Sequence, residues 1–147
     1  MTPAMAWAVG WLVATALHAG FQLTVSLVVY PAFPRVPASA WADFHAGHSR
    51  GIAPLVGVLY AGLLATAAGV LVVGPVGAWL FVALVGVAVA LGTTALVAAP
   101  THGRLGAGPD PVLLRRLRRA DAVRTVGALV GAAGATLHLL AVVGGAA

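Results

Sequence analysis

Long apolar stretches dominate this chain, and polar residues are confined mostly to their ends. Four stretches exceed the roughly 20 apolar residues that a helix needs to cross a bilayer. They cover approximately residues 5–30, 52–73, 76–99 and 125–145. Because hydrocarbon offers backbone groups no partners, such stretches are stable as helices. The pattern predicts an all-α fold, a four-transmembrane-helix bundle in which residues 1–147 form a single integral membrane domain.

Two amphipathic segments flank the predicted spans. We expect residues 38–50 to form a short interfacial helix before span 2, with Ser39 as its N-cap, and residues 111–119 to form another before span 4. In the second, Asp110 precedes a proline, as a helix N-cap commonly does. Its leucines are expected to face lipid and its arginines the phosphate headgroups. The favoured alternative is that these arginines only set the topology, without recognising a particular lipid.

Charge is distributed unevenly along the chain. The net charge is +5, from eight arginines against three aspartates. Arg35 and Arg50 flank the first connection, six arginines lie in residues 104–124, and the segment after Arg124 carries none. Positive charge in short loops stays cytoplasmic. We therefore predict an inner or plasma membrane protein with both termini outside. The partners expected of this charge are the lipid bilayer and its anionic headgroups, with no nucleic acid.

Span 1 carries a polar stripe through its apolar surface. Its members recur at helical spacing and fall within roughly 80° of one another. They are Trp11, Thr15, His18, Gln22 and Ser26. Lipid would leave them unpartnered, so the stripe should face the bundle interior or a cavity. His18 and Gln22 then serve either helix–helix hydrogen bonding or the binding of a cofactor or proton at membrane depth.

His138 is the corresponding polar residue of span 4. It continues the helical face that starts at Arg124 and runs through small residues, and it lies roughly 21 Å along the helix from that arginine. His138 is thus expected nearer the outer leaflet than His18. With Gln22, the two histidines are the predicted cofactor-binding residues at membrane depth.

Three further histidines are predicted near the cytoplasmic boundary. His45 and His48 lie on the aromatic face of residues 38–50, and Pro100 is expected to end span 3 and place His102 at the same level. Imidazoles spaced i, i+3 can point at a common ion, and without thiolates or glutamates such a site suits copper or iron. Alternatively, His45 and His48 are interfacial residues that hydrogen-bond carbonyls near Pro54.

The residue types that are missing restrict the chemistry. The chain has no cysteine, so thiolate metal sites and disulfides are excluded. It also has no glutamate, so carboxylate-bridged di-iron chemistry has no ligands.

The two halves of the chain show one weak correspondence. Pro31 and Arg35 follow span 1 at the spacing with which Pro100 and Arg104 follow span 3. A duplicated helical hairpin would produce this pattern. The shared chemistry of a helix leaving the membrane would produce it equally well.

The chain resembles the DUF1772 superfamily of small four-span membrane proteins, which includes anthrone oxygenase-like proteins. The resemblance rests on residues 30–33 (YPAF), Trp41, residues 44–48 (FHAGH) and residues 100–105 (PTHGRL), followed by Asp110, Arg124 and Thr125. It implies a polar pocket on the cytoplasmic side that includes His45, His48, His102 and Arg124. The chain departs from the family pattern at residues 120–122, where Ala-Asp-Ala stands in place of an expected tryptophan or asparagine.

These observations lead to one hypothesis and two rivals. The first is a membrane-embedded oxidoreductase, an oxygenase acting on a hydrophobic aromatic small molecule. His45, His48 and His102 would hold a redox metal or act as acid–base groups, and Arg124 would orient an anionic oxygen. The rivals are a small transporter or haem- or metal-handling protein that uses His18 and His138, and a non-catalytic structural subunit. A homo-oligomer is compatible with each of them.

Overall fold

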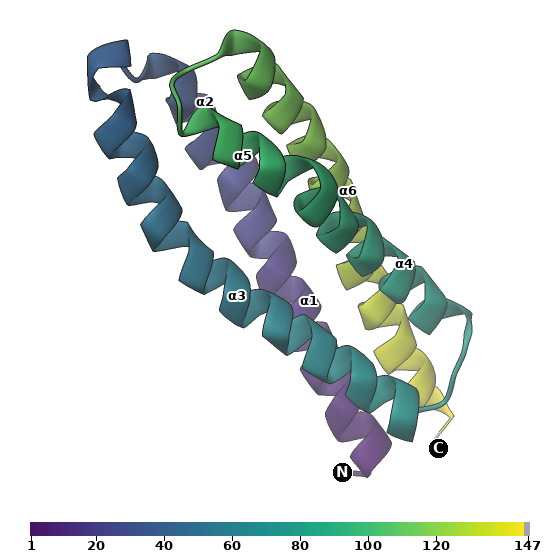
Figure 1. Ribbon diagram of the computed structural model, residues 1–147. Helices are drawn as coiled ribbons and strands as arrows, with labels where there is room; N and C mark the ends of the chain where they lie inside the picture. Colours follow the sequence, from purple (N-terminus) through teal and green to yellow (C-terminus); the bar gives the residue numbers. More distant parts are fainter. Residues whose placement is uncertain (146–147) are drawn as a thin grey trace.

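Four long helical rods make up the protein in a computed structural model that describes residues 1–145 (Figure 1). No strand occurs among these residues. The first rod comprises α1 (Pro3–Thr24), η1 (Val25–Val29), α2 (Tyr30–Ala32) and η2 (Phe33–Arg35), and a short turn, η3 (Ala38–Ala40), leads into the second, α3 (Trp41–Val73). The third comprises α4 (Ala78–Thr93), η4 (Thr94–Ala98) and α5 (Ala99–Leu105), and the fourth is α6 (Pro111–Gly144). The predicted all-α four-helix bundle is confirmed, and all four rods are long and apolar enough to cross a membrane.

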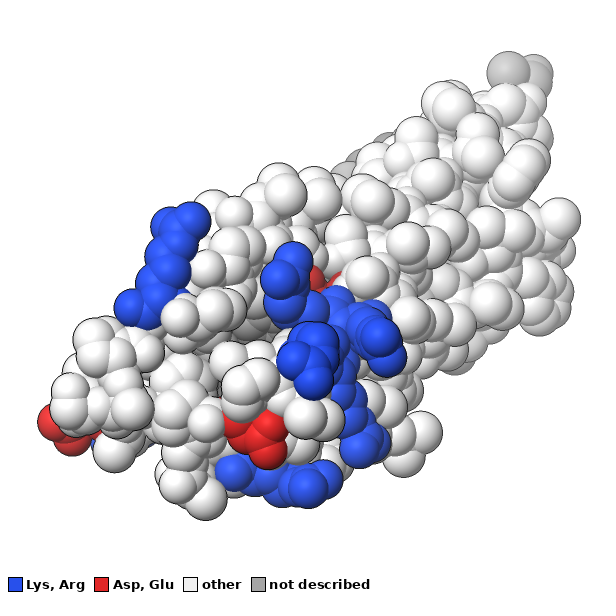
Figure 2. Space-filling model, turned by 90° about the horizontal axis from the view of Figure 1, so that it is seen from above, with Lys and Arg blue, Asp and Glu red and all other residues white. Residues whose placement is uncertain are grey.

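The packing of the rods is uneven. α6 packs along both α4 and α1, and α3 packs along α1 while making little contact with α4. The connections from α2 to α3 and from α5 to α6 lie at one end of the bundle, and both termini lie at the other (Figure 1). Arginines gather at the end with these two connections (Figure 2). The bundle is therefore polar at one end only, and the side between α3 and α4 is loosely closed.

The two interfacial helices expected before spans 2 and 4 are not separate elements. Each is the first part of a continuous helix, α3 or α6. In α3 neither Gly47 nor Gly51 takes the positive φ that ends a helix, and Pro54 is accommodated inside it. Ser39 as N-cap is also wrong, because a 3₁₀ turn comes first and α3 begins after Ala40 without a side-chain cap.

The start of α6 confirms one prediction and corrects another. Asp110 caps the helix, since its Oδ1 accepts hydrogen bonds from the backbone N–H groups of Val112 at 2.6 Å and Leu113 at 3.2 Å. The leucines that were expected to face lipid instead face inward: Leu113 and Leu117 are buried. They pack against aromatic residues of the first rod and of α3, and this packing buries apolar leucine surface.

π-Helical turns interrupt the first and third rods just before a proline. η1 precedes Pro31 and η4 precedes Pro100, so each proline enters the following α-helix near its first position. A proline leaves a carbonyl of the preceding turn without its usual donor, and the wider i→i+5 turn redistributes those bonds. The prediction that Pro100 ends the third helix is therefore wrong, because the rod continues to Leu105.

The interior has two apolar clusters with a polar layer between them. One, near the arginine-rich end, is aromatic and includes Tyr30, Phe33 and Trp41, and the other, toward the termini, includes Trp11 and Leu80. Between them lie buried polar residues of α1 and α6, which are His18, Gln22, Asp121 and Arg124. The polar layer is what the stripe of span 1 predicted.

Close backbone contact holds α4 against α6. A Cβ atom on Gly86 would lie 2.5 Å from the backbone nitrogen of Gly131, and one on Gly127 would lie 2.7 Å from the carbonyl oxygen of Gly86. Small residues permit such a close approach. In a membrane the hydrophobic effect does not drive helices together, so this close packing contributes much of their association. This contact fixes the position of α6 and so of the polar residues it carries.

Candidate functional site

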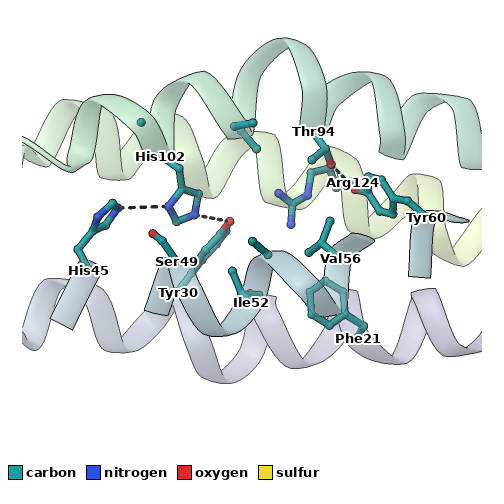
Figure 3. A pocket seen from close by; sticks show the side chains of 14 residues that line it. Phe21, Tyr30, His45, Ser49, Ile52, Val56, Tyr60, Thr94, His102 and Arg124 are labelled. Carbon is teal, nitrogen blue, oxygen red and sulfur yellow. Dashed lines mark hydrogen bonds between the residues drawn. The ribbon is translucent and has the colours of Figure 1, made fainter. Parts of the chain in front are cut away.

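A cavity of about 420 Å³ lies between α3 and the third rod, with the first rod and α6 behind it (Figure 3). Side chains from all four rods line it. They are Phe21 and Tyr30; His45, Ser49, Ile52, Ala53, Val56 and Tyr60; Thr94, Ala98, Ala99, His102 and Gly103; and Arg124. This volume lies within the range of small-molecule sites, and the mixture of apolar walls with a few polar groups is typical of them.

The cavity has a buried inner side and an exposed rim. Tyr30 and Arg124 are buried, whereas Ala53, Ala99 and Gly103 at the rim are exposed. The rim belongs to α3 and α5, and α3 barely contacts the third rod along its length. The open side of the cavity therefore lies on an apolar flank of the bundle.

Three polar side chains form a hydrogen-bonded series inside the cavity. The Nε2 of His102 lies 3.2 Å from the Tyr30 hydroxyl, and its Nδ1 lies 3.5 Å from Nε2 of His45 (Figure 3). His45 is held in turn by Trp41, whose ring stacks on it at 5.7 Å and whose Nε1 donates to the Leu105 carbonyl at 2.8 Å. His102 thus has a partner for each ring nitrogen, which fixes the orientation of its ring.

Arg124 sits deep in the same cavity as part of a buried network. Its Nη2 donates to Oε1 of Gln22 at 3.0 Å and lies 3.5 Å from Oδ1 of Asp121, and its guanidinium lies 5.9 Å from the Tyr30 ring centre. Gln22 in turn donates to Asp121 at 2.9 Å. The guanidinium Nε has no hydrogen-bond partner. A cation oriented in this way can hold an anionic oxygen in the cavity.

Asp121 is the counter-ion that the sequence interpretation missed as a site residue. Its other oxygen accepts a hydrogen bond from Ser26, which also contacts Thr125 at 2.7 Å. Asp121 lies just before the predicted span 4 (residues 125–145), so the predicted spans gave no reason to expect it inside the bundle. The signal for burial was the polar stripe: Gln22 and Ser26 need partners, and Asp121 lies on the same face of α6 as Arg124.

Tyr30 and Tyr60 were also not predicted as site residues. Tyr30 was noted only within the YPAF segment, and Tyr60 looked like one more apolar residue of span 2. In the structure the Tyr60 hydroxyl contacts Thr94 Oγ1 at 2.6 Å across the cavity. A tyrosine inside a span carries a hydroxyl that needs a partner, and this is the signal that could have identified both.

His48 lies near the cavity but does not line it. Its ring stacks on Phe44 and on His102, at 6.4 Å and 5.6 Å between ring centres, and its Nε2 is buried without a partner. It lines a neighbouring cleft between α3 and the first rod instead. Four residues were predicted to be catalytic. Three of them, His45, His102 and Arg124, line the cavity, and His48 does not.

The three imidazoles are not arranged as ligands of a common metal ion. Ligand nitrogens must aim at one point in the planes of their rings, but the rings of His48 and His102 are stacked at 20° and those of His45 and His102 are tilted by 32°. Among residues 1–145, no group of three or more His, Cys, Asp or Glu side chains is placed to hold an ion. The three histidines do not fit a metal as they stand, and a copper or iron site stays a prediction from the sequence.

The two other histidines lie apart from this cluster. His18 is 1% exposed, contacts the edge of the Tyr60 ring at 5.6 Å and has no hydrogen-bond partner on either nitrogen. His138 is buried in α6, and its Nε2 also lacks a partner. Gln22, predicted with them as cofactor-binding, instead belongs to the Arg124 network.

No family model, curated protein or solved structure matches this chain. The resemblance to the anthrone oxygenase-like superfamily therefore stays a prediction, and function is argued from the cavity and its residues.

Proposed function

We propose that the protein is a membrane-embedded oxidoreductase, an oxygenase that acts on a hydrophobic aromatic small molecule carrying an acidic oxygen. The observation that carries the proposal is the placement of His102 between Tyr30 and His45 inside an apolar cavity that also contains the Arg124 guanidinium. This combination supplies a base, a cation and hydrophobic walls in one space.

Binding follows from the lining of the cavity. Phe21, Ile52 and Val56 offer apolar and aromatic surface to a flat ring system. The open rim between α3 and α5 admits the molecule from the hydrocarbon of the membrane. Arg124 donates to a phenolate or enolate oxygen, and its charge favours the anionic form of that oxygen over the neutral one.

The reaction assigned to the site begins with a proton transfer. The substrate displaces the hydrogen-bond partner of one His102 nitrogen, whose electron pair then takes a proton from the substrate. The other partner holds the ring in place, and Arg124 stabilises the resulting anion. Dioxygen is the oxidant: a CH₂ group loses two hydrogens and becomes C=O, and the second oxygen atom leaves as water. The residues of this chain supply every step of proton handling.

The test is turnover of a lipophilic anthrone by purified protein in nanodiscs, measured as oxygen uptake and quinone formation. We expect His102→Asn to lower kcat by on the order of a hundredfold or more, and Arg124→Gln mainly to raise KM. His138→Asn is the matched control, because His138 does not line the cavity, and it should retain activity. Equal loss in His138→Asn and His102→Asn, or turnover unaffected by either, would refute the assignment.

Metal analysis of the same preparations separates the two forms of the chemistry. The acid–base mechanism predicts turnover that survives treatment with chelators. Copper or iron bound in a one-to-one ratio and lost in both His45→Ala and His102→Ala would overturn it in favour of a metal-dependent oxygenase.

A carrier is the second candidate function, and the unpartnered imidazoles of His18 and His138 favour it. Buried polar groups without partners are costly in a membrane and are commonly found on ion or proton pathways. Proton flux into liposomes that contain the protein tests this function. Flux lost in His18→Leu and His138→Leu but kept in His102→Asn supports the carrier.

A further inference from the structure

Two adjoining hollows lie on another flank of the bundle, along α4, η4 and the first half of α6. The hollow nearer the start of α6 is a groove of about 720 Å³, lined by three arginines, one threonine and apolar residues. They are Arg115, Arg116 and Arg119, with Thr93, Val97, Val112, Ala120 and Val123. The groove is separate from the cavity of the proposed enzyme, which shares no residue with it.

The three arginines have no counter-ion within the described part of the chain. In residues 1–145 the only ion pair joins Arg124 to Asp121. Arg115, Arg116 and Arg119 are exposed on adjacent positions of the helix surface, where i, i+3 and i+4 residues are neighbours. Guanidinium groups bind phosphate oxygens in a bidentate manner, so this cluster is complementary to a phosphate group.

Beside the groove, toward the middle of the bundle, runs a shallow apolar channel that is open to the surface along its side. A second hollow of about 410 Å³ lies directly along α4 and α6 and shares Val123 with the first. It is lined by Val85, Gly86, Val89, Ala122, Val123, Val126, Gly127 and Val130. The tight contact of Gly86 with Gly127 forms its base, because neither residue has a side chain to fill the space.

The dimensions of the two hollows match a lipid. From Arg119 to Val130 the helix rises roughly 16 Å, and one leaflet of the hydrocarbon core is about 15 Å thick. We propose that the region binds one anionic phospholipid, with its phosphate among Arg115, Arg116 and Arg119 and one acyl chain along the valines of α4 and α6. A soluble anion would bind the arginines but would leave the apolar channel unoccupied.

The test uses delipidated protein in detergent, with thermal unfolding and native mass spectrometry as readouts. The probes are phosphatidylglycerol, phosphatidylcholine with the same acyl chains, and glycerol phosphate. We expect phosphatidylglycerol alone to stabilise the protein and to remain bound. Equal stabilisation by phosphatidylcholine, or by glycerol phosphate, would overturn the proposal.

Two variants separate the headgroup site from general charge. R115Q/R116Q/R119Q should weaken phosphatidylglycerol binding on the order of tenfold or more, since each basic residue near an anionic headgroup contributes appreciably. R35Q/R50Q/R104Q removes the same charge from exposed arginines that line neither hollow, and it should retain affinity. Equal weakening in both variants would overturn the proposal.

A third variant tests the acyl channel without changing charge. Val126→Trp fills the channel and should displace the lipid, whereas Val58→Trp, on the exposed surface of α3, should not. Since neither alters an arginine, their comparison remains informative if the triple variant fails to insert correctly. Unchanged phosphatidylglycerol binding in Val126→Trp would refute the placement of the chain.

Discussion

Replacing Asp121 by asparagine leaves the Arg124 guanidinium as an uncompensated charge inside the bundle. The pair is separated by 3.5 Å, and both side chains are buried. At an effective dielectric constant near 20, the attraction at this distance is about 5 kcal/mol. Breaking a buried pair typically costs about 3–5 kcal/mol. Asparagine is neutral but has the same length as aspartate, so it still reaches Gln22 and Ser26. We therefore expect Asp121→Asn to lower the free energy of unfolding by about 3 kcal/mol, the lower end of this range.

A double-mutant cycle isolates this interaction. Arg124→Gln leaves the carboxylate buried and should destabilise the protein by a similar amount, whereas the double variant contains no buried charge in this layer. Its loss should fall below the sum of the two single losses by about 2 kcal/mol or more. Reversible unfolding in mixed micelles, followed by tryptophan fluorescence, measures all three. Asp43→Asn, at an exposed carboxylate, is the control and should change stability little.

A coupling energy below about 0.5 kcal/mol would refute the reasoning. It would mean that the two groups act independently, and that Arg124 is held in the cavity by Gln22 and by packing alone. The proposed orientation of the guanidinium toward a bound oxyanion would then lose its main support.

Three further changes test the site and the packing that positions it. Tyr30→Phe removes the hydroxyl that orients the pocket imidazole and should lower kcat on the order of tenfold with little effect on KM; an unchanged kcat would show that the contact is not used. Gly127→Leu places a Cβ 2.7 Å from the Gly86 carbonyl oxygen and should lower the free energy of unfolding by about 2 kcal/mol or more. Gly57→Leu is the control and should cost little, because a Cβ at Gly57 would meet no atom within 4 Å. Denaturant titration compares the two variants. Ala53→Trp narrows the rim of the cavity and should raise KM without altering the unfolding midpoint, and a lowered midpoint instead would indicate a packing role.

The polar residues within apolar stretches predicted the inner face of the first rod and part of that of the fourth. His18, Gln22 and His138 were expected at membrane depth and are buried there, and Arg124, placed in a pocket by the family resemblance, is buried too. The reason is that unpartnered polar groups are unstable in hydrocarbon, so a polar stripe on a long apolar helix must face the interior of the bundle. The same argument would have placed Asp121 inside, had span 4 not been expected to begin after it.

Lateral neighbours could not be derived from the sequence. His45 and His102 were predicted at the same depth, but their contact depends on how closely α3 approaches the third rod. That distance follows from how α3 packs on α1, and how α4 packs on α6, and periodicity does not reveal these pairings. The continuity of α3 through Pro54 was missed for a related reason, since a proline lowers helix stability locally while packing along α1 offsets the cost.

The π turns add a second feature to the correspondence between the two halves of the chain. η1 and Pro31 recur as η4 and Pro100 with a constant offset of 69 positions (25 to 94, 31 to 100). A π turn commonly arises when one residue is inserted into an α-helix, which rotates everything beyond it by about 100°. If one ancestral hairpin was copied, the insertion came before the copying. Deleting one residue from η1 would rotate Tyr30 away from His102. Deleting one residue from η4 would likewise rotate His102 away from Tyr30.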